Sequence, residues 1–175
     1  MNPPMWTLAL QGFRKAHARH DRDRLTTDPT RVFISAAECV YWAATIDERL
    51  REWPGYKGFT DTHPVGSLLP GVRYVRNLKT HILPMTLQRV EGKMYPVIYP
   101  VVYAEVVWLP LEQLPKPSRT SKYIELQERS YSEQMAGSPT RNTLYRLMEG
   151  FADLEALPNS PFEESSWFVS TTNDG

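Results

Sequence analysis

The 175-residue sequence holds one cysteine, Cys39, and lacks any long hydrophobic run. A single cysteine excludes a disulfide within the chain and is typical of a reducing compartment. We recognise neither a secretory signal peptide nor a segment apolar and long enough to span a bilayer. The expectation from these absences is a cytoplasmic protein without membrane association.

Net charge is also absent, because 20 Lys and Arg residues balance 20 Asp and Glu residues. A neutral chain has no global field that recruits nucleic acid, so any such binding requires a local basic patch. Hydrophobic residues make up 41% of the chain and charged residues 23%, which is ordinary for a globular protein. The length fits one domain that buries a core without disulfides.

Apolar residues at helical spacing predict a mainly α fold, a bundle of four to five helices. The expected helices cover about residues 4–20, 30–53, 68–84, 122–135 and 139–157. The core stripe expected for the second helix is Phe33, Ile34, Ala37, Val40, Tyr41 and Ala44. Residues 53–67, rich in Gly, Pro and aromatics, are expected to form a loop that either stacks on bases or is pinned to the bundle.

Residues 85–109 are rich in Val, Ile and Tyr, and residues 94–109 place alternate side chains on two opposite faces, which predicts an inserted β-hairpin. Its turn is expected at Glu91-Gly92-Lys93, and Pro96 and Pro100 restrict it to an edge. The helical domain is expected to cover residues 1–157. The tail of residues 158–175 is rich in Pro, Ser, Asn and acids, and we expect it to be loose or to dock through Trp167 and Phe168.

One stretch, residues 68–84, contains no acidic residue at all. Read as a helix, it has an apolar stripe of Val72, Val75, Leu78 and Ile82, with Lys79 at its edge. The other face carries Arg73, Arg76, Asn77, Thr80 and His81. A face of Arg, Asn, Thr and His without acids suits an anion.

Acids do occur near the end of the preceding helix. The predicted core stripe continues to Glu48, with Asp47 beside it. Two interpretations remain open for them. Either the helix has passed the core, so that these acids meet water or pair with Arg51, or Glu48 approaches the face of Arg76 and His81 and orients one of them.

A metal site is not expected. His17 and His20 have H-x-x-H spacing and Asp21 follows, but no Cys or compact acid cluster completes a ligand set. No cofactor is expected either.

Residues 76–81 read R-N-x-x-x-H, and this motif resembles the signature of the HEPN superfamily, in which Asn commonly follows the Arg. The resemblance covers residues 4–84 and 122–157 and leaves the hairpin as an insertion. It implies a HEPN-like helical bundle and the activity of a metal-independent endoribonuclease, with two motifs facing each other across the cleft of a homodimer.

The resemblance also implies roles for the motif residues. His81 would act as general base on a ribose 2′-hydroxyl or as acid on the leaving oxygen, and Arg76 would stabilise charge on the scissile phosphate. Asn77 would fix the tautomer of His81 or contact the phosphate. Arg73 and Thr80 are candidate substrate-binding residues, and Glu48 is a possible support.

Residues five apart on one helix point about 140° apart, which favours a composite site built by two chains. The resemblance implies RNA as substrate, and a toxin or defence role with a possible antitoxin or immunity partner. Toxins that are modified by nucleotidyltransferase antitoxins often have a tyrosine where this chain has Leu83, so that control is not expected. The alternative function is a non-catalytic protein- or RNA-binding module that uses the Tyr-rich hairpin.

Overall fold

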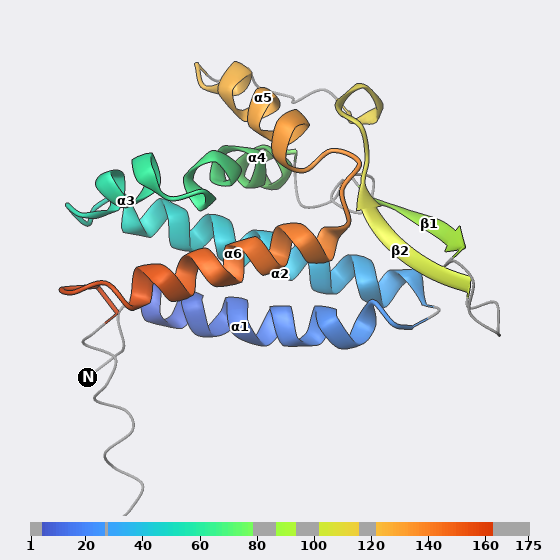
Figure 1. Cartoon of the computed structure of the whole chain (residues 1–175), viewed down its shortest axis with the longest axis horizontal. Helices are drawn as coiled ribbons and strands as arrows, with labels where there is room; N and C mark the ends of the chain where they lie inside the picture. Colours follow the sequence, from blue (N-terminus) through green and yellow to red (C-terminus); the bar gives the residue numbers. More distant parts are fainter. Residues whose placement is uncertain (1–4, 27, 79–86, 94–101, 116–121, 163–175) are drawn as a thin grey trace, which may run out of the picture.

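The computed structural model describes residues 5–26, 28–78, 87–93, 102–115 and 122–162. The described chain is mainly helical and forms a bundle, in which α1 packs on α2 and α6, and α4 lies between α2 and α5 (Figure 1). Two strands lie at one end of the bundle. In chain order the elements are α1 (Met5–Asp23), α2 (Pro29–Leu50), α3 (Tyr56–Thr62), α4 (Val65–Asn77), β1 (Leu87–Lys93), β2 (Val102–Trp108), the 3-10 turn η2 (Leu111–Gln113), α5 (Ile124–Gln134) and α6 (Thr140–Glu155).

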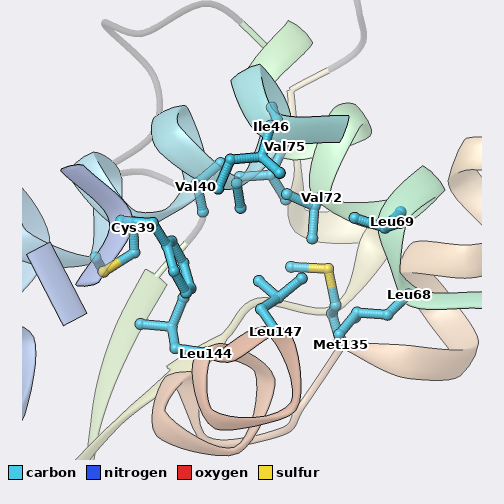
Figure 2. Packing of buried hydrophobic residues seen from close by; sticks show 14 of the residues in the cluster. Cys39, Val40, Ile46, Leu68, Leu69, Val72, Val75, Met135, Leu144 and Leu147 are labelled. Carbon is cyan, nitrogen blue, oxygen red and sulfur yellow. The ribbon is translucent and has the colours of Figure 1, made fainter. Parts of the chain in front are cut away.

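The core is built mainly from α1, α2, α4 and α6, with Met135 entering from the end of α5. Figure 2 shows residues of α2 and α4 facing those of α6 and Met135 across this core. The labelled residues are Cys39, Val40, Ile46, Leu68, Leu69, Val72, Val75, Met135, Leu144 and Leu147. Among the described helices, none is both long and apolar enough to cross a membrane.

The buried face of α2 differs from the predicted stripe. Val40 and Ala44 are buried as expected, but Ile34 and Tyr41 are about half exposed. The helix instead buries a face rich in small residues, which lets α1 approach closely. This face comprises Val32, Ser35, Ala36, Cys39, Ala43, Ile46, Asp47 and Leu50. Asp47, and not Glu48, therefore continues the buried side.

Helix α4 differs from the helix predicted for residues 68–84 at both ends. It begins at Val65 and ends at Asn77, with Leu78 as its C-cap. Val72, Val75 and Leu78 are buried as the apolar stripe predicts. The remainder of the predicted helix, residues 79–84, lies outside the described residues, and with it the expected positions of Lys79, Thr80, His81 and Ile82.

Pro70 lies inside α4, where a proline normally disrupts the helical hydrogen bonds. The Ser130 hydroxyl of α5 fills the gap: it accepts from the Gly71 N–H at 2.8 Å and donates to the Ser67 carbonyl at 2.6 Å. It thereby replaces the bond that Gly71 would make to Ser67 in a regular helix. A Cβ on Gly71 would lie 3.0 Å from the Tyr131 backbone, so glycine is what allows α5 to pack this closely.

The loop predicted for residues 53–67 is wrong in its middle, because Tyr56–Thr62 forms α3. This short helix is pinned to the bundle by its buried residue Tyr56. Farther along, the Phe59 ring stacks on His63 with 4.7 Å between the ring centroids. Of the two interpretations of this segment, packing against the bundle is therefore confirmed for Tyr56.

Strands β1 and β2 pair antiparallel, with Leu87 opposite Trp108 and Lys93 opposite Val102. The turn predicted at Glu91-Gly92-Lys93 is wrong, since these residues belong to β1. Pro96 and Pro100 lie outside the described residues. Trp108 ties β2 to α6, because its buried ring donates from Nε1 to the Thr143 hydroxyl at 2.9 Å.

Helices α5 and α6 lie within two residues of their predicted bounds. The segment after α6 is packed as far as it is described: Phe162 is buried, and Trp6 Nε1 donates to the Pro161 carbonyl at 2.8 Å. This start of the predicted loose tail (residues 158–175) is therefore docked on α1. Trp167 and Phe168 lie outside the described residues.

Candidate functional site

A pocket of about 530 Å³ opens beside α4 and contains part of the R-N-x-x-x-H motif. Residues of α2 and α3 line one part of it, and the start of α5 lines another. Arg73, Arg76 and Asn77 of α4 reach the pocket together with Glu48 of α2. The fold thus brings together four of the six residues that the sequence singled out.

Asp47 is the centre of the inner part of this pocket, and its side chain is only 3% exposed. The carboxylate accepts hydrogen bonds from Arg73 Nη1 at 2.5 Å, from Arg51 Nη2 at 2.8 Å and from the Tyr56 hydroxyl at 3.0 Å. Burial, and then the Asp47 carboxylate, raise the pKa of the Tyr56 phenol. Tyr56 therefore remains a donor, and the buried charge is well satisfied.

The outer part of the pocket holds a second ion pair, between Arg76 Nη2 and Glu48. Here the acid is 44% exposed, so water competes with the pair. Arg76 Nε is buried and has no hydrogen-bond partner within the described part of the chain. Arg76 is thus oriented by Glu48 and retains a donor that the protein does not use there.

Of the two interpretations left open for Glu48, the pair with Arg76 matches the second, and it is Asp47 that meets Arg51. In the fold, Arg73 and Arg76 each pair with a carboxylate of α2. Residues 68–84 contain no acid, but α2 supplies two from a distant part of the sequence. An anion entering the pocket has to compete with Glu48 for Arg76.

Positive charge still exceeds negative charge around the pocket. Its lining contains four bases and two acids, in a chain whose net charge is zero. The bases are Arg51, Lys57, Arg73 and Arg76, and the acids are Asp47 and Glu48. This is the local basic patch that a neutral chain requires to bind an anion.

Thr80 and His81 lie outside the described residues. Helix α4 ends at Asn77, so the 140° divergence predicted for Arg76 and His81 on one helix involves a residue outside the described part of the chain. His81 follows Asn77 by four residues, which covalent geometry limits to a Cα separation of about 14 Å.

Sequence patterns missed three further contributors to the pocket: Asp47 as the central carboxylate, Tyr56 as its donor, and the Tyr123–Leu126 edge of α5. Pairing of Asp47 with Arg51, one helical turn later, was one of the interpretations left open, but the burial of Asp47 was not predicted. Tyr56 had none, because it belonged to an expected loop.

His20 is a satisfied core histidine. Its Nδ1 lies 3.2 Å from the Ser35 hydroxyl and its Nε2 lies 3.1 Å from the Thr140 hydroxyl. Because Ser35 donates to the Val32 carbonyl, its oxygen accepts from Nδ1–H, and Nε2 accepts from Thr140. Burial lowers the pKa of His20 to about 4. Within the described ranges, no three His, Cys, Asp or Glu side chains are grouped as metal ligands.

Comparisons with known proteins give no relative for this chain. No family model matches the sequence, no curated protein matches it, and no solved structure matches its fold.

Proposed function

We propose that this chain is a metal-independent endoribonuclease of the HEPN type, which cleaves RNA by attack of a 2′-hydroxyl on the adjacent phosphate. The observation that carries the proposal is the pocket, whose lining includes Arg76 and Asn77 and contains more bases than acids. In the sequence, His81 follows Asn77 by four residues. In such a reaction the protein must stabilise phosphate charge and move protons, and Arg and His suit these tasks.

Arg76 binds the scissile phosphate in this mechanism. Glu48 holds its Nη2 and thereby orients the guanidinium group, whose remaining N–H groups at the pocket bind the phosphate oxygens. Arg73 is held by the buried Asp47 and contributes positive charge behind it. Asn77 contacts the phosphate or fixes the His81 tautomer, and Thr80 contacts substrate.

His81 transfers the protons. As general base it takes the proton of the attacking 2′-hydroxyl, and as general acid it gives one to the leaving 5′-oxygen. A second copy of the chain supplies the complementary proton-transfer group if the enzyme works as a homodimer with two motifs across one cleft. The strand pair is then an insertion, at residues 85–109, in a HEPN-like bundle. A toxin or defence role, with an antitoxin or immunity partner, belongs to the same proposal.

The test is cleavage of single-stranded RNA by the purified chain in EDTA. The wild type is expected to cleave, and His81→Ala to lose about 10²–10⁴-fold in turnover with RNA affinity retained. His17→Ala, a histidine of α1 outside the pocket, is the control and should cleave normally. Activity that disappears in EDTA and returns with Mg²⁺ would refute the metal-independent mechanism. Sedimentation at micromolar concentration tests the homodimer.

A second candidate, a non-catalytic protein- or RNA-binding module using the Tyr-rich hairpin, is favoured by one observation. Carboxylates of α2 neutralise both Arg73 and Arg76, and arginines with a purely structural role would form the same pairs. Wild-type protein that leaves RNA uncut, together with His81→Ala protein that unfolds, would favour this candidate.

A further inference from the structure

The part of the pocket lined by α5 differs chemically from the part lined by α2 and α4. Tyr123 and Leu126 both line the pocket and are 53% and 43% exposed. Tyr123 is the N-cap of α5 and Leu126 lies three residues later in its first turn, and both face the same pocket. Exposed apolar residues are common singly, but this pair lies at the edge of a pocket that three arginines also line.

The exposure of this pair follows from how α5 is fixed on α4. The Ser130 hydroxyl bridges Gly71 and Ser67, and Tyr131 is fully buried against α4. These contacts set the rotation of α5 about its axis. Tyr123 and Leu126 then fall at the edge of the helix interface, where they meet the pocket instead of the core.

A nucleotide matches both sides of this pocket. Its phosphate suits Arg76, and its flat, largely apolar base suits an aromatic ring and a leucine. Lys122 Nζ lies 4.9 Å from the Tyr123 ring centroid and adds positive charge to this side. The volume of about 530 Å³ falls within the roughly 300–1,000 Å³ range of small-ligand pockets. A duplex keeps its bases paired and stacked, so only an unpaired nucleotide can offer its base here.

We propose that Tyr123 and Leu126 form a base-binding wall, which receives the base of an unpaired nucleotide while Arg76 holds its phosphate. The wall makes an unpaired base next to the bound phosphate a requirement for tight binding. This inference rests on the proposed function, because the oligonucleotide is the substrate of that reaction. It adds residues from an element that the R-N-x-x-x-H motif does not include.

The experiment measures fluorescence anisotropy of the full-length chain with a labelled single-stranded hexamer of 2′-O-methyl RNA. The methyl group removes the attacking hydroxyl, so binding is measured without cleavage. Tyr123→Ala and Leu126→Ala should each weaken binding, by about 5- to 100-fold for the loss of base stacking on Tyr123. Tyr123→Phe should bind like the wild type, because the ring is retained.

Two matched controls separate the wall from exposed apolar residues in general. Tyr145 of α6 is 57% exposed and Leu8 of α1 is 41% exposed, and neither lines the pocket. Tyr145→Ala and Leu8→Ala should bind as the wild type does. A hexamer of the same backbone without bases should bind wild type and Tyr123→Ala equally, because the wall then has nothing to contact.

The outcomes distinguish the two proposals. If Arg76→Ala weakens binding but Tyr123→Ala and Leu126→Ala do not, the base wall is refuted and the ribonuclease proposal stands. The wall is also refuted if the abasic hexamer still distinguishes Tyr123→Ala from wild type. If the wild type neither binds the hexamer nor cleaves unmodified RNA, the ribonuclease proposal and the wall are both refuted.

Discussion

Two buried polar networks lie near opposite ends of α2, and they are built differently. Near its start, His20 is held between two neutral hydroxyls, those of Ser35 and Thr140. Near its end, the charged Asp47 is held by Arg73, by Arg51 and by the Tyr56 hydroxyl.

The difference shows how one of these two networks contributes to a pocket while the other does not. The His20 network satisfies itself and closes the junction of α1, α2 and α6. The Asp47 network leaves Arg73 at the wall of a pocket, next to the exposed pair of Arg76 and Glu48. The buried carboxylate of Asp47 has to be surrounded by positive charge, and the arginines that provide this charge also face an anionic ligand that enters the pocket.

Of the two networks, the one around Asp47 is expected to contribute more to the free energy of unfolding. Asp47→Ala leaves Arg73 and the Tyr56 hydroxyl without their buried partner, and should lower the free energy of unfolding by about 3–5 kcal/mol. Asp61→Ala is the control, since Asp61 is exposed and pairs with Lys57 on the surface, and should cost less than about 1 kcal/mol. Urea unfolding of both variants measures the difference. Equal midpoints would mean that Asp47 is not the centre of a structural network.

The His20 network predicts a pH effect of intermediate size. The pKa of His20 is about 4 in the folded chain and about 6.5 when unfolded, so only the unfolded state takes up this proton between those values. Stability from this group is therefore complete above pH 6.5 and falls as the pH drops towards 4, by about 3 kcal/mol in total.

Urea unfolding at pH 7.5, 5.5 and 4 measures this loss in the wild type and in His20→Gln. The variant lacks the titrating group and should lose that part of the pH dependence. If both proteins lose the same stability between pH 7.5 and 4, other groups cause the acid sensitivity and His20 is not the origin.

The smallest effect on stability is expected at Glu48. Glu48→Gln removes one charge of a half-exposed pair and should change the free energy of unfolding by less than about 1 kcal/mol. It also removes the carboxylate that competes with an anion for Arg76, so affinity for single-stranded RNA should rise while turnover falls, because Arg76 loses its orienting partner. Anisotropy and single-turnover cleavage check the two parts. Weaker RNA binding by the variant would show that Glu48 does not compete with the substrate.

The relation between Asp47 and Glu48 also shows how far the sequence can be interpreted. A stripe chosen by large apolar residues selected Ile34 and Tyr41, and this rotation placed Glu48 on the core side. The folded helix buries Ala36, Cys39 and Ala43, because closely packed helices require small side chains at their interface as well as apolar ones. Rotation by one residue exchanged the roles of the two acids.

Helix α4 shows a second limit. Its apolar positions Val72, Val75 and Leu78 were predictable from their spacing. The bounds of the helix were not predictable. At its start, Pro70 is tolerated inside the helix because Ser130, about sixty residues away in the sequence, supplies a hydroxyl to the interrupted hydrogen-bond ladder. At its end, the sequence contains no helix-breaking residue between Asn77 and Pro84. Contacts of this range leave no local signal.

The central claim is that the outer pair of Arg76 and Glu48 serves a ligand and is not needed for the fold. Arg76→Ala tests it against Arg19→Ala, since Arg19 of α1 forms a comparable exposed pair with Glu38 of α2, outside the pocket. The measurement is single-turnover cleavage of single-stranded RNA in EDTA, with urea unfolding of the same samples.

We expect Arg76→Ala to lose about 10²–10³-fold in cleavage rate, the usual effect of removing one donor from a charge-stabilising site. Its stability should stay within about 1 kcal/mol of wild type, as for an exposed pair. Arg19→Ala should match wild type in both measurements. Wild-type cleavage by Arg76→Ala, or loss of cleavage only through unfolding, would contradict the claim.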